Sequence, residues 1–168
     1  MIILGIDPGY AIVGYGVLSY VGNKFTVLDF GAITTDKDTE FPTRLEQIYD
    51  GVGYLIEKWK PAAMAVEELF FNTNSTTAIK VAGARGCCLL SAKKHGVDIN
   101  EYTPLQVKQS VTGYGRAVKS QVMEMTRMLL NLDHIPKPDD AADALAVAIC
   151  HAHTSGSMVG KLKNLGIK

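Results

Sequence analysis

The chain has 168 residues, the size of one domain, and its 47% hydrophobic residues can bury a substantial core, which excludes a disordered protein. Its formal net charge of zero argues against a strongly basic nucleic-acid binder. No apolar run approaches the roughly 18 residues that span a membrane, and the first residues show no signal-peptide pattern, so we expect a cytoplasmic protein with no membrane contact.

The charge is unevenly distributed along the chain. Residues 1–75 hold 5 Lys and Arg against 10 Asp and Glu, whereas residues 76–127 hold 8 against 3. An acidic part joined to a basic part is compatible with binding of a polyanion near an acidic metal site. It is equally compatible with an ordinary solvated surface, so this pattern leaves both interpretations open.

The first predicted strand, residues 2–7, is the element on which the rest of the chain depends. It is apolar up to Asp7, and Pro8-Gly9 ends it. Because an unpaired buried charge costs on the order of several kcal/mol, Asp7 must be paired, bound to a metal ion or placed at an open edge. Two further strands, over 12–20 and 24–34, follow through short turns and should be antiparallel, and glycines in the first of them suggest a closely packed neighbour.

The remaining elements alternate between helices and strands. A helix capped by Thr43, with Glu46 completing a capping box, should run to Trp59. The elements expected after it are a strand over 62–69, a loop over 70–75, a helix to about Lys94, a strand over 97–102 and helices over 104–111, 117–130 and 139–153. Right-handed crossovers make the fourth and fifth strands parallel to the first. The predicted fold class is therefore α/β, a mixed five-stranded sheet with helices on both faces, followed by a flexible tail over 154–168.

Two pairs of acidic residues can meet in such a fold. If the first and fourth strands are parallel neighbours, Asp7 and Glu67 lie side by side at the carboxyl edge of the sheet, where α/β proteins form ligand sites. Asp140 and Asp143 are three residues apart and project from one face of the last helix. Converging carboxylates need a cation between them, and oxygen ligands without zinc-like His or Cys spacing favour Mg²⁺ or Mn²⁺. Two such ions about 3.5–4 Å apart suit in-line phosphodiester hydrolysis.

Each acid also has a structural interpretation. Asp140 can cap the last helix, Asp143 can face the helix dipole, and Glu67 can belong to a solvated strand end. Asp7 is the hardest to explain in this way, because its strand is too apolar for a charge without a partner. The four acids together therefore favour a metal site.

Six short motifs follow one another along the chain: Gly-Ile-Asp-Pro-Gly at 5–9, Val-Glu-Glu-Leu-Phe at 66–70, Ala-Arg-Gly at 84–86, Thr-Pro-Leu-Gln-Val-Lys at 103–108, Lys-Ser-Gln-Val at 119–122 and Asp-Ala-Ala-Asp-Ala-Leu-Ala at 140–146. The first motif alone is weak, but the ordered set is specific. It resembles the RuvC family of Holliday-junction resolvases. The resemblance implies a single nuclease domain of ribonuclease-H-like fold over residues 1–153.

The resemblance also implies roles for individual residues. The catalytic and metal-binding carboxylates, which would hold two Mg²⁺ ions replaceable by Mn²⁺, are Asp7, Glu67, Asp140 and Asp143. The residues that would contact DNA are Phe70, Arg85, Lys108 and Lys119. Phe70 would stack on an unpaired base of the junction, or alternatively anchor its loop, and each lysine could be an ordinary surface residue.

The function that the resemblance implies is a structure-selective endonuclease of homologous recombination and DNA repair. It would resolve four-way Holliday junctions by symmetric hydrolysis of two opposed strands. A homodimer is implied, because a two-fold axis would match the symmetry of the junction. The branch-migration complex of RuvA and RuvB is implied as a partner.

Three other classes remain as alternatives. A sugar kinase or actin-like ATPase shares the Gly-Ile-Asp strand and turn, but 168 residues leave no room for its second domain. A ribonuclease H or integrase-like nuclease would share the metal site and differ in substrate. A non-catalytic junction-binding protein is disfavoured, because acids that face phosphates without a metal ion weaken binding.

Overall fold

The structure is a computed structural model and describes residues 1–68 and 75–156. The elements in chain order are β1 (Ile2–Asp7), β2 (Ile12–Val21), β3 (Lys24–Thr34), α1 (Phe41–Trp59), β4 (Ala63–Glu67), α2 (Ser75–Lys94), β5 (Asp98–Tyr102), α3 (Pro104–Thr112), α4 (Lys119–Leu129) and α5 (Asp139–Gly156). None of the helices in these ranges is long and apolar enough to cross a membrane.

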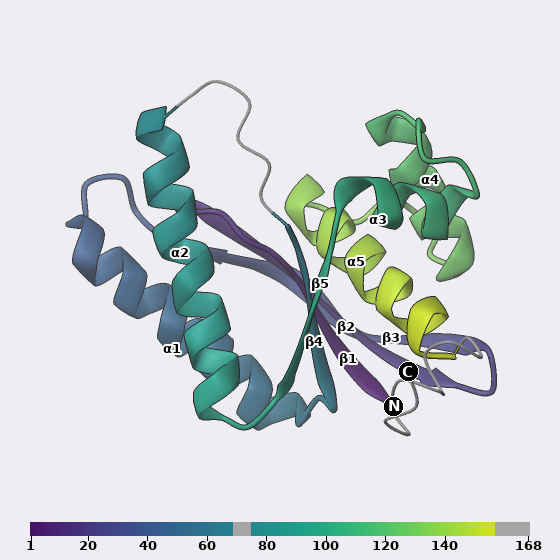
Figure 1. Cartoon of the computed structure of the whole chain (residues 1–168), viewed down its shortest axis with the longest axis horizontal. Helices are drawn as coiled ribbons and strands as arrows, with labels where there is room; N and C mark the ends of the chain where they lie inside the picture. The colour runs from purple at the N-terminus through teal and green to yellow at the C-terminus, as the bar shows by residue number, and fades with distance from the viewer. Residues whose placement is uncertain (69–74, 157–168) are drawn as a thin grey trace, which may run out of the picture.

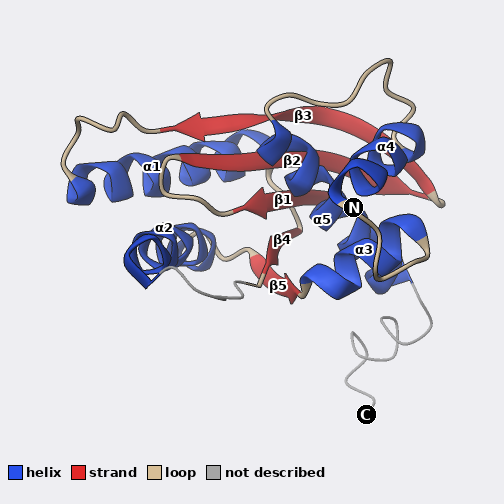
Figure 2. Ribbon diagram, turned by 90° about the horizontal axis from the view of Figure 1, so that it is seen from above, coloured by secondary structure: helices blue, strands red, loops and turns tan. Residues whose placement is uncertain are grey.

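The strands form one sheet in the order β3-β2-β1-β4-β5. β2 pairs antiparallel with β1 and β3, whereas β4 pairs parallel with β1 and β5. Helices α1 and α2 cover one face of this sheet, and α3, α4 and α5 cover the other (Figure 1). Seen from above, β1 lies in the middle of the sheet (Figure 2). The predicted fold class is confirmed.

The side chains of β1 are buried on both faces, as its apolar sequence predicts. Ile3 belongs to the core under α5, and Leu4 belongs to the core under α1 and α2. Both side chains have no exposed surface. Since successive side chains of a strand point to opposite faces, this one strand contributes to two cores. Any polar group at its end is therefore held by packing on both sides.

Glycines and alanines bring α5 against the sheet. A Cβ atom at Gly5 would lie 2.0 Å from the carbonyl oxygen of Ala144, and one at Gly14 would lie 2.0 Å from that of Asp140. The inner face of α5 is rich in buried alanine, so its backbone approaches β1 and β2 closely. The glycines predicted to allow close packing do so, and their partner is α5.

Some predicted boundaries were wrong. Helix α1 begins at Phe41 after Glu40, and Glu40 makes no side-chain capping bond. Thr43 is therefore not the N-cap, because Pro42, which has no N–H group to leave unbonded, already occupies the first turn. Helix α4 starts at Lys119 rather than at 117, whereas Thr103 caps α3 and forms a capping box with Gln106.

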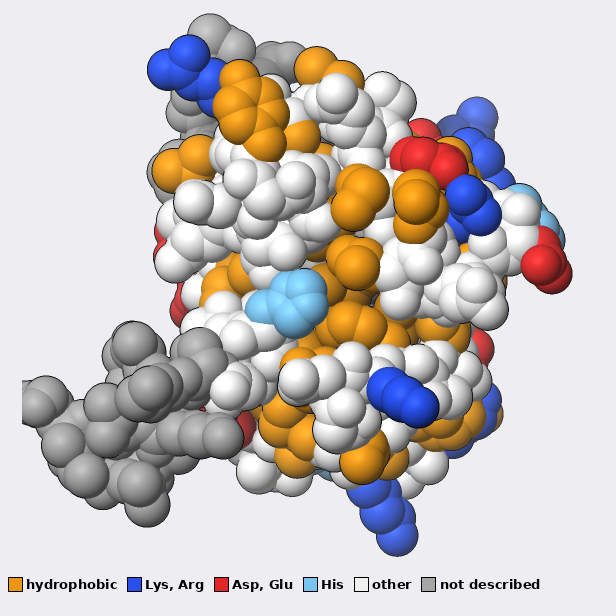
Figure 3. Space-filling model, turned by 90° about the vertical axis from the view of Figure 1, so that its right-hand side faces the viewer, with side chains coloured by type: hydrophobic (Ala, Val, Ile, Leu, Met, Phe, Trp, Pro, Cys, Tyr) orange, Lys and Arg blue, Asp and Glu red, His pale blue; other side chains and the backbone are white. Residues whose placement is uncertain are grey.

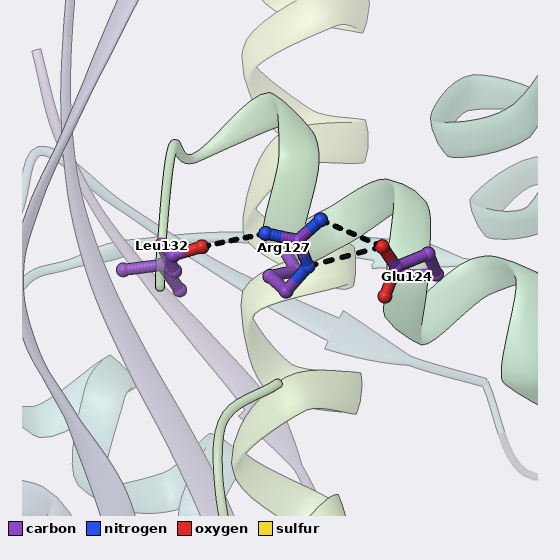
Figure 4. A network of polar contacts seen from close by, with 3 residues as sticks. All are labelled: Glu124, Arg127 and Leu132. Carbon is purple, nitrogen blue, oxygen red and sulfur yellow. Dashed lines mark hydrogen bonds and ion pairs between the residues drawn. The ribbon is translucent and has the colours of Figure 1, made fainter. Parts of the chain in front are cut away.

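The last helix is longer than predicted, since α5 continues to Gly156. Residues 154–156, expected in a flexible tail, form its last turn, and the remainder of that tail lies outside the described residues. Arg127, in the last turn of α4, hydrogen-bonds a backbone carbonyl group in the connection from α4 to α5. Its guanidinium donates to the carbonyl oxygen of Leu132 at 2.8 Å and to the carboxylate of Glu124 at 2.7 and 3.0 Å (Figure 4).

Candidate active site

The end of β1 and the end of β4 bring two acids together. The parallel register pairs Ile6 with Val66, so Asp7 and Glu67 are the next residues on neighbouring strands. Glu67 is in turn paired with Tyr102 on β5. The prediction that Asp7 and Glu67 lie side by side is confirmed at the level of the backbone.

The first turn of α5 brings the other two acids to the same edge. Asp7 faces Gly14 in the β1–β2 ladder, and Gly14 packs directly against the backbone of Asp140. Asp143 follows one turn later on the same helix. The small residues of β2 therefore set the distance at which the α5 acids stand from Asp7.

The four carboxylates act on one another electrostatically. Burial and the charges of Asp143, Glu67 and Asp140, in that order, raise the pKa of Asp7 to about 7. Burial and the charge of Asp143 raise the pKa of Glu67. Since the acids share a half-buried space, each negative charge opposes ionisation of its neighbours, and a bound cation would relieve this repulsion.

Two lysines oppose this negative charge. Lys119 of α4 forms an ion pair with Asp143, with Nζ 2.8 Å from Oδ2. Lys108 of α3 and Lys119 both lower the pKa of Glu67. They line a pocket of about 200 Å³ together with Glu67, Pro104, Val107, Val122, Asp143 and Ala146. Both lysines predicted to contact DNA thus lie next to the predicted metal ligands.

The donor set fits a hard divalent cation such as Mg²⁺, because every candidate ligand is a carboxylate oxygen and their charges converge. The four carboxylates, in the positions that the structure gives them, do not form a complete metal site. Over residues 1–68 and 75–156, no three His, Cys, Asp or Glu side chains converge closely enough to hold an ion. Asp143 is drawn to Lys119 instead, so ion binding would require that the lysine release this carboxylate.

The other predicted DNA contacts lie elsewhere. Arg85 of α2 forms an ion pair with Glu101 of β5, and its side chain is 18% exposed. Its assignment as a DNA contact therefore stays a prediction from the motif. Phe70 lies outside the described residues.

Basic side chains lie at several places on the side of the molecule that carries α3 and α4. Several Lys and Arg side chains lie together at the upper right of this view and others lie singly, around a middle in which hydrophobic side chains gather (Figure 3).

One group near the site has no signal in the sequence. Arg44, in the first turns of α1, is buried and donates hydrogen bonds to the carbonyl oxygen of Tyr10 and to Thr35 Oγ1. Tyr10 lies in the loop directly after Asp7. An arginine in an amphipathic helix is ordinarily a surface residue, so only the three-dimensional structure shows this contact.

The comparisons with known proteins agree with this geometry. The family model described as crossover junction endodeoxyribonuclease RuvC matches residues 3–151. A protein of that name from Alkaliphilus metalliredigens is 60% identical over 154 residues, which cover 92% of this chain and 94% of the relative. The structure of Thermus thermophilus RuvC has a TM-score of 0.86 and 37% identity, covering 92% of this chain and 95% of that one. A second structure, T. thermophilus RuvC in complex with Holliday junction substrate, has the same TM-score of 0.86 over 90% of this chain and 93% of that one. The chain therefore belongs to the RuvC family of crossover junction endodeoxyribonucleases.

Proposed function

We propose that this protein resolves Holliday junctions in the cytoplasm, in homologous recombination and DNA repair, with a single nuclease domain over residues 1–153. It hydrolyses one phosphodiester bond in each of two opposed strands. The observation that carries the proposal is the meeting of the β1, β4 and α5 acids at one sheet edge in a chain of this family. The complex of T. thermophilus RuvC with a Holliday junction substrate supports the choice of DNA structure.

The metal ligands in this proposal are Asp7, Glu67, Asp140 and Asp143. Two Mg²⁺ ions, or Mn²⁺ in their place, would supply an activated water and stabilise the leaving 3′-oxygen. Asp7, which neighbours the other three acids electrostatically, is the ligand best placed to be shared. The carboxylates orient the reacting groups and hold negative charge, and no covalent enzyme intermediate is needed.

The lysines have a separate task in the proposal. Lys108 and Lys119 line the same pocket as Glu67 and Asp143, so their ammonium groups can attract the phosphate that is to be cut. Lys119 also forms an ion pair with the Asp143 carboxylate. The lysine would exchange this carboxylate for a phosphate when DNA and metal bind.

The proposal includes a homodimer, which would place two such sites on a two-fold junction. The outer face of α2 supports it. Ile79 is 72% exposed and Leu90 is 54% exposed on this helix, and a Cβ atom at Gly86 would meet nothing within 4 Å. An apolar, closely approachable helix face of this kind fits a second copy of the same helix. The dimer would act on junctions moved by RuvA and RuvB.

The test is nicking of a mobile four-way junction with and without Mg²⁺, beside a linear duplex of the same sequence. Paired symmetric nicks that need Mg²⁺ and occur on the junction alone are the expected result. Junction binding without nicks in both Mg²⁺ and Mn²⁺ would leave only a binding module. Nicking of the linear duplex or of an RNA–DNA hybrid would keep the metal site but replace the substrate.

A further inference from the structure

Arg44 is an almost fully buried cation close to the active-site edge. It is 6% exposed. Its Nη2 donates to the carbonyl oxygen of Tyr10 at 3.0 Å, and its Nε donates to Thr35 Oγ1 at 2.8 Å. Its guanidinium carbon lies 4.7 Å from the centre of the Tyr10 ring. Within the described part of the chain it forms no ion pair with a carboxylate, and its hydrogen-bond partners are neutral groups.

A second cation stands over the same aromatic ring. Nζ of Lys80, on α2, lies 5.5 Å from the centre of the Tyr10 ring, and Lys80 is exposed. It too makes no ion pair among the residues that the structure describes. The edge of the Phe41 ring packs against Tyr10 with centroids 6.5 Å apart. One ring therefore gathers two positive charges that come from α1 and α2, and neither forms an ion pair with a carboxylate of residues 1–68 or 75–156.

This cluster lies at the same edge of the sheet as the acids. Tyr10 is in the loop after Asp7, and Thr35 follows the end of β3, which runs parallel to β1 through the two antiparallel pairings with β2. The Thr35 hydroxyl donates to the carbonyl oxygen of Tyr10 at 2.7 Å and ties these two segments together. Arg44 and Lys80 belong to the early turns of α1 and α2.

The two sets of cations lie on opposite faces of the sheet. Helices α1 and α2 cover one face, and α3 and α4, which carry Lys108 and Lys119, cover the other (Figure 1). A DNA strand that has its scissile phosphate at the acids and continues over the α1–α2 side would bring its next phosphates toward the Tyr10 cluster.

We propose that Lys80, Tyr10 and Arg44 form a second phosphate site, which binds the DNA backbone on the α1–α2 side of the scissile bond. This proposal rests on the nuclease function proposed above. Lys80 is the group that contacts the phosphodiester, because it is exposed. Arg44 is a positioning residue that holds the Tyr10 loop and adds its charge beside the ring. A backbone phosphate supplies a counter-charge for two cations that form no ion pair within the described residues.

The test compares Lys80→Gln with Lys24→Gln, which removes an exposed lysine at the start of β3. Binding of a four-way junction is measured by fluorescence anisotropy without divalent metal, over a series of KCl concentrations. Lys80→Gln should weaken binding and reduce the slope of log Kd against log salt by about one. Lys24→Gln should leave the slope unchanged. Equal slopes in wild type and Lys80→Gln would overturn the site.

Two further measurements separate the possible failures. Tyr10→Leu keeps the carbonyl group that Arg44 and Thr35 bind but removes the ring that both cations contact, so it should also weaken junction binding in protein shown to be folded by thermal unfolding. Unchanged affinity of this variant would remove the ring from the site. Wild-type nicking is assayed in parallel: its absence would overturn the proposed function, whereas nicking combined with an unchanged Lys80→Gln slope would overturn the phosphate site alone.

Discussion

Asp7 lies where burial and three other carboxylates all oppose its negative charge. Together they raise the pKa of Asp7 from 3.8 to about 7, against the opposing effect of Lys119. The folded protein therefore binds this proton more tightly than the unfolded chain does. Folding stability is consequently lost as pH rises from about 4 to 7, and the loss then remains at higher pH.

Replacing Asp7 with Asn should for this reason stabilise the metal-free protein at pH 8. The expected rise in Tm is on the order of 5 °C, and it should shrink toward pH 4. The measurement is thermal unfolding in EDTA across this pH range, with Asp50→Asn, an exposed acid of α1, as the control. A variant less stable than wild type at pH 8 would mean that the other acids do not oppose the negative charge of Asp7.

The same substitution should abolish junction nicking. An amide cannot supply the anionic oxygen that a shared Mg²⁺ ligand must provide, so a loss of at least about 100-fold is expected. Junction binding at low Mg²⁺ should persist or tighten, because one negative charge that faces phosphates is removed. Single-turnover cleavage and anisotropy separate the two effects. Near wild-type nicking by Asp7→Asn would refute the metal assignment.

Lys119 forms an ion pair with Asp143 and Lys108 does not, so their alanine variants should differ in stability. Both alanine variants should reduce the dependence of junction binding on salt, by about one unit of slope each, if the ammonium groups contact phosphates. Lys119→Ala also removes the partner of Asp143 and a charge that lowers the pKa of Asp7 and Glu67. It should therefore lower the Tm of the metal-free protein at pH 8 more than Lys108→Ala does. Unchanged salt slopes of binding and unchanged nicking rates would show that both lysines are ordinary surface residues.

At the scale of elements, the contact of α5 with the sheet decides where two of the four acids stand. A Cβ atom at Gly14 would lie 2.0 Å from the carbonyl oxygen of Asp140, and this backbone oxygen cannot move away unless the helix moves with it. Gly14→Ala should push the first turn of α5 away from Asp7. We expect a loss of about 2–4 kcal/mol in stability and at least about tenfold in nicking.

A matched control exists at the other end of the same helix. A Cβ atom at Gly156 would lie 3.6 Å from the Tyr20 ring, which is an ordinary contact. Gly156→Ala should leave both stability and nicking close to wild type. Denaturant unfolding and junction nicking of the two variants measure the difference, and equal behaviour would show that α5 does not position its acids through Gly14.

The elements that sequence reasoning predicted correctly are those whose signal is local. The apolar run of β1 and its Pro-Gly end each depend on a few adjacent residues. The prediction that Asp7 and Glu67 lie side by side followed from the right-handed crossover rule, because few strand orders satisfy it. The start of α1 was wrong because Thr43 and Pro42 carry competing start signals, and the chain used the proline.

Long-range side-chain contacts could not be predicted in the same way. The pairing of Arg85 with Glu101 joins α2 to β5, and that of Arg44 with Tyr10 joins α1 to the loop after β1. No spacing in the sequence encodes either contact, because each depends on how two separate elements pack. The meeting of the acids and the nearby lysines could thus be predicted, whereas the contacts of Arg44 and Arg85 could not.

At the scale of the whole molecule, symmetric resolution requires that two active sites act on one junction. The described residues of one copy carry one set of the four acids, so the homodimer proposed above would supply the second set. The outer face of α2 offers Ile79, Gly86 and Leu90 to such a copy. Leu90 is 54% exposed, so a charge there would be solvated in the monomer but buried in a dimer.

Leu90→Glu should therefore convert the protein to a monomer that is still folded. Its control is Met128→Glu, which places the same charge at a residue 57% exposed on α4. Light scattering after size-exclusion chromatography should give the dimer mass for Met128→Glu and the monomer mass for Leu90→Glu. The second assay uses a supercoiled plasmid that extrudes a cruciform, on which paired cuts give linear plasmid and single cuts give nicked circles. For Leu90→Glu the ratio of linear to nicked plasmid should fall at least about tenfold, because two uncoupled monomers must then bind one junction in succession. A Leu90→Glu protein that stays dimeric and still makes paired cuts would place the dimer contact on another face of the molecule.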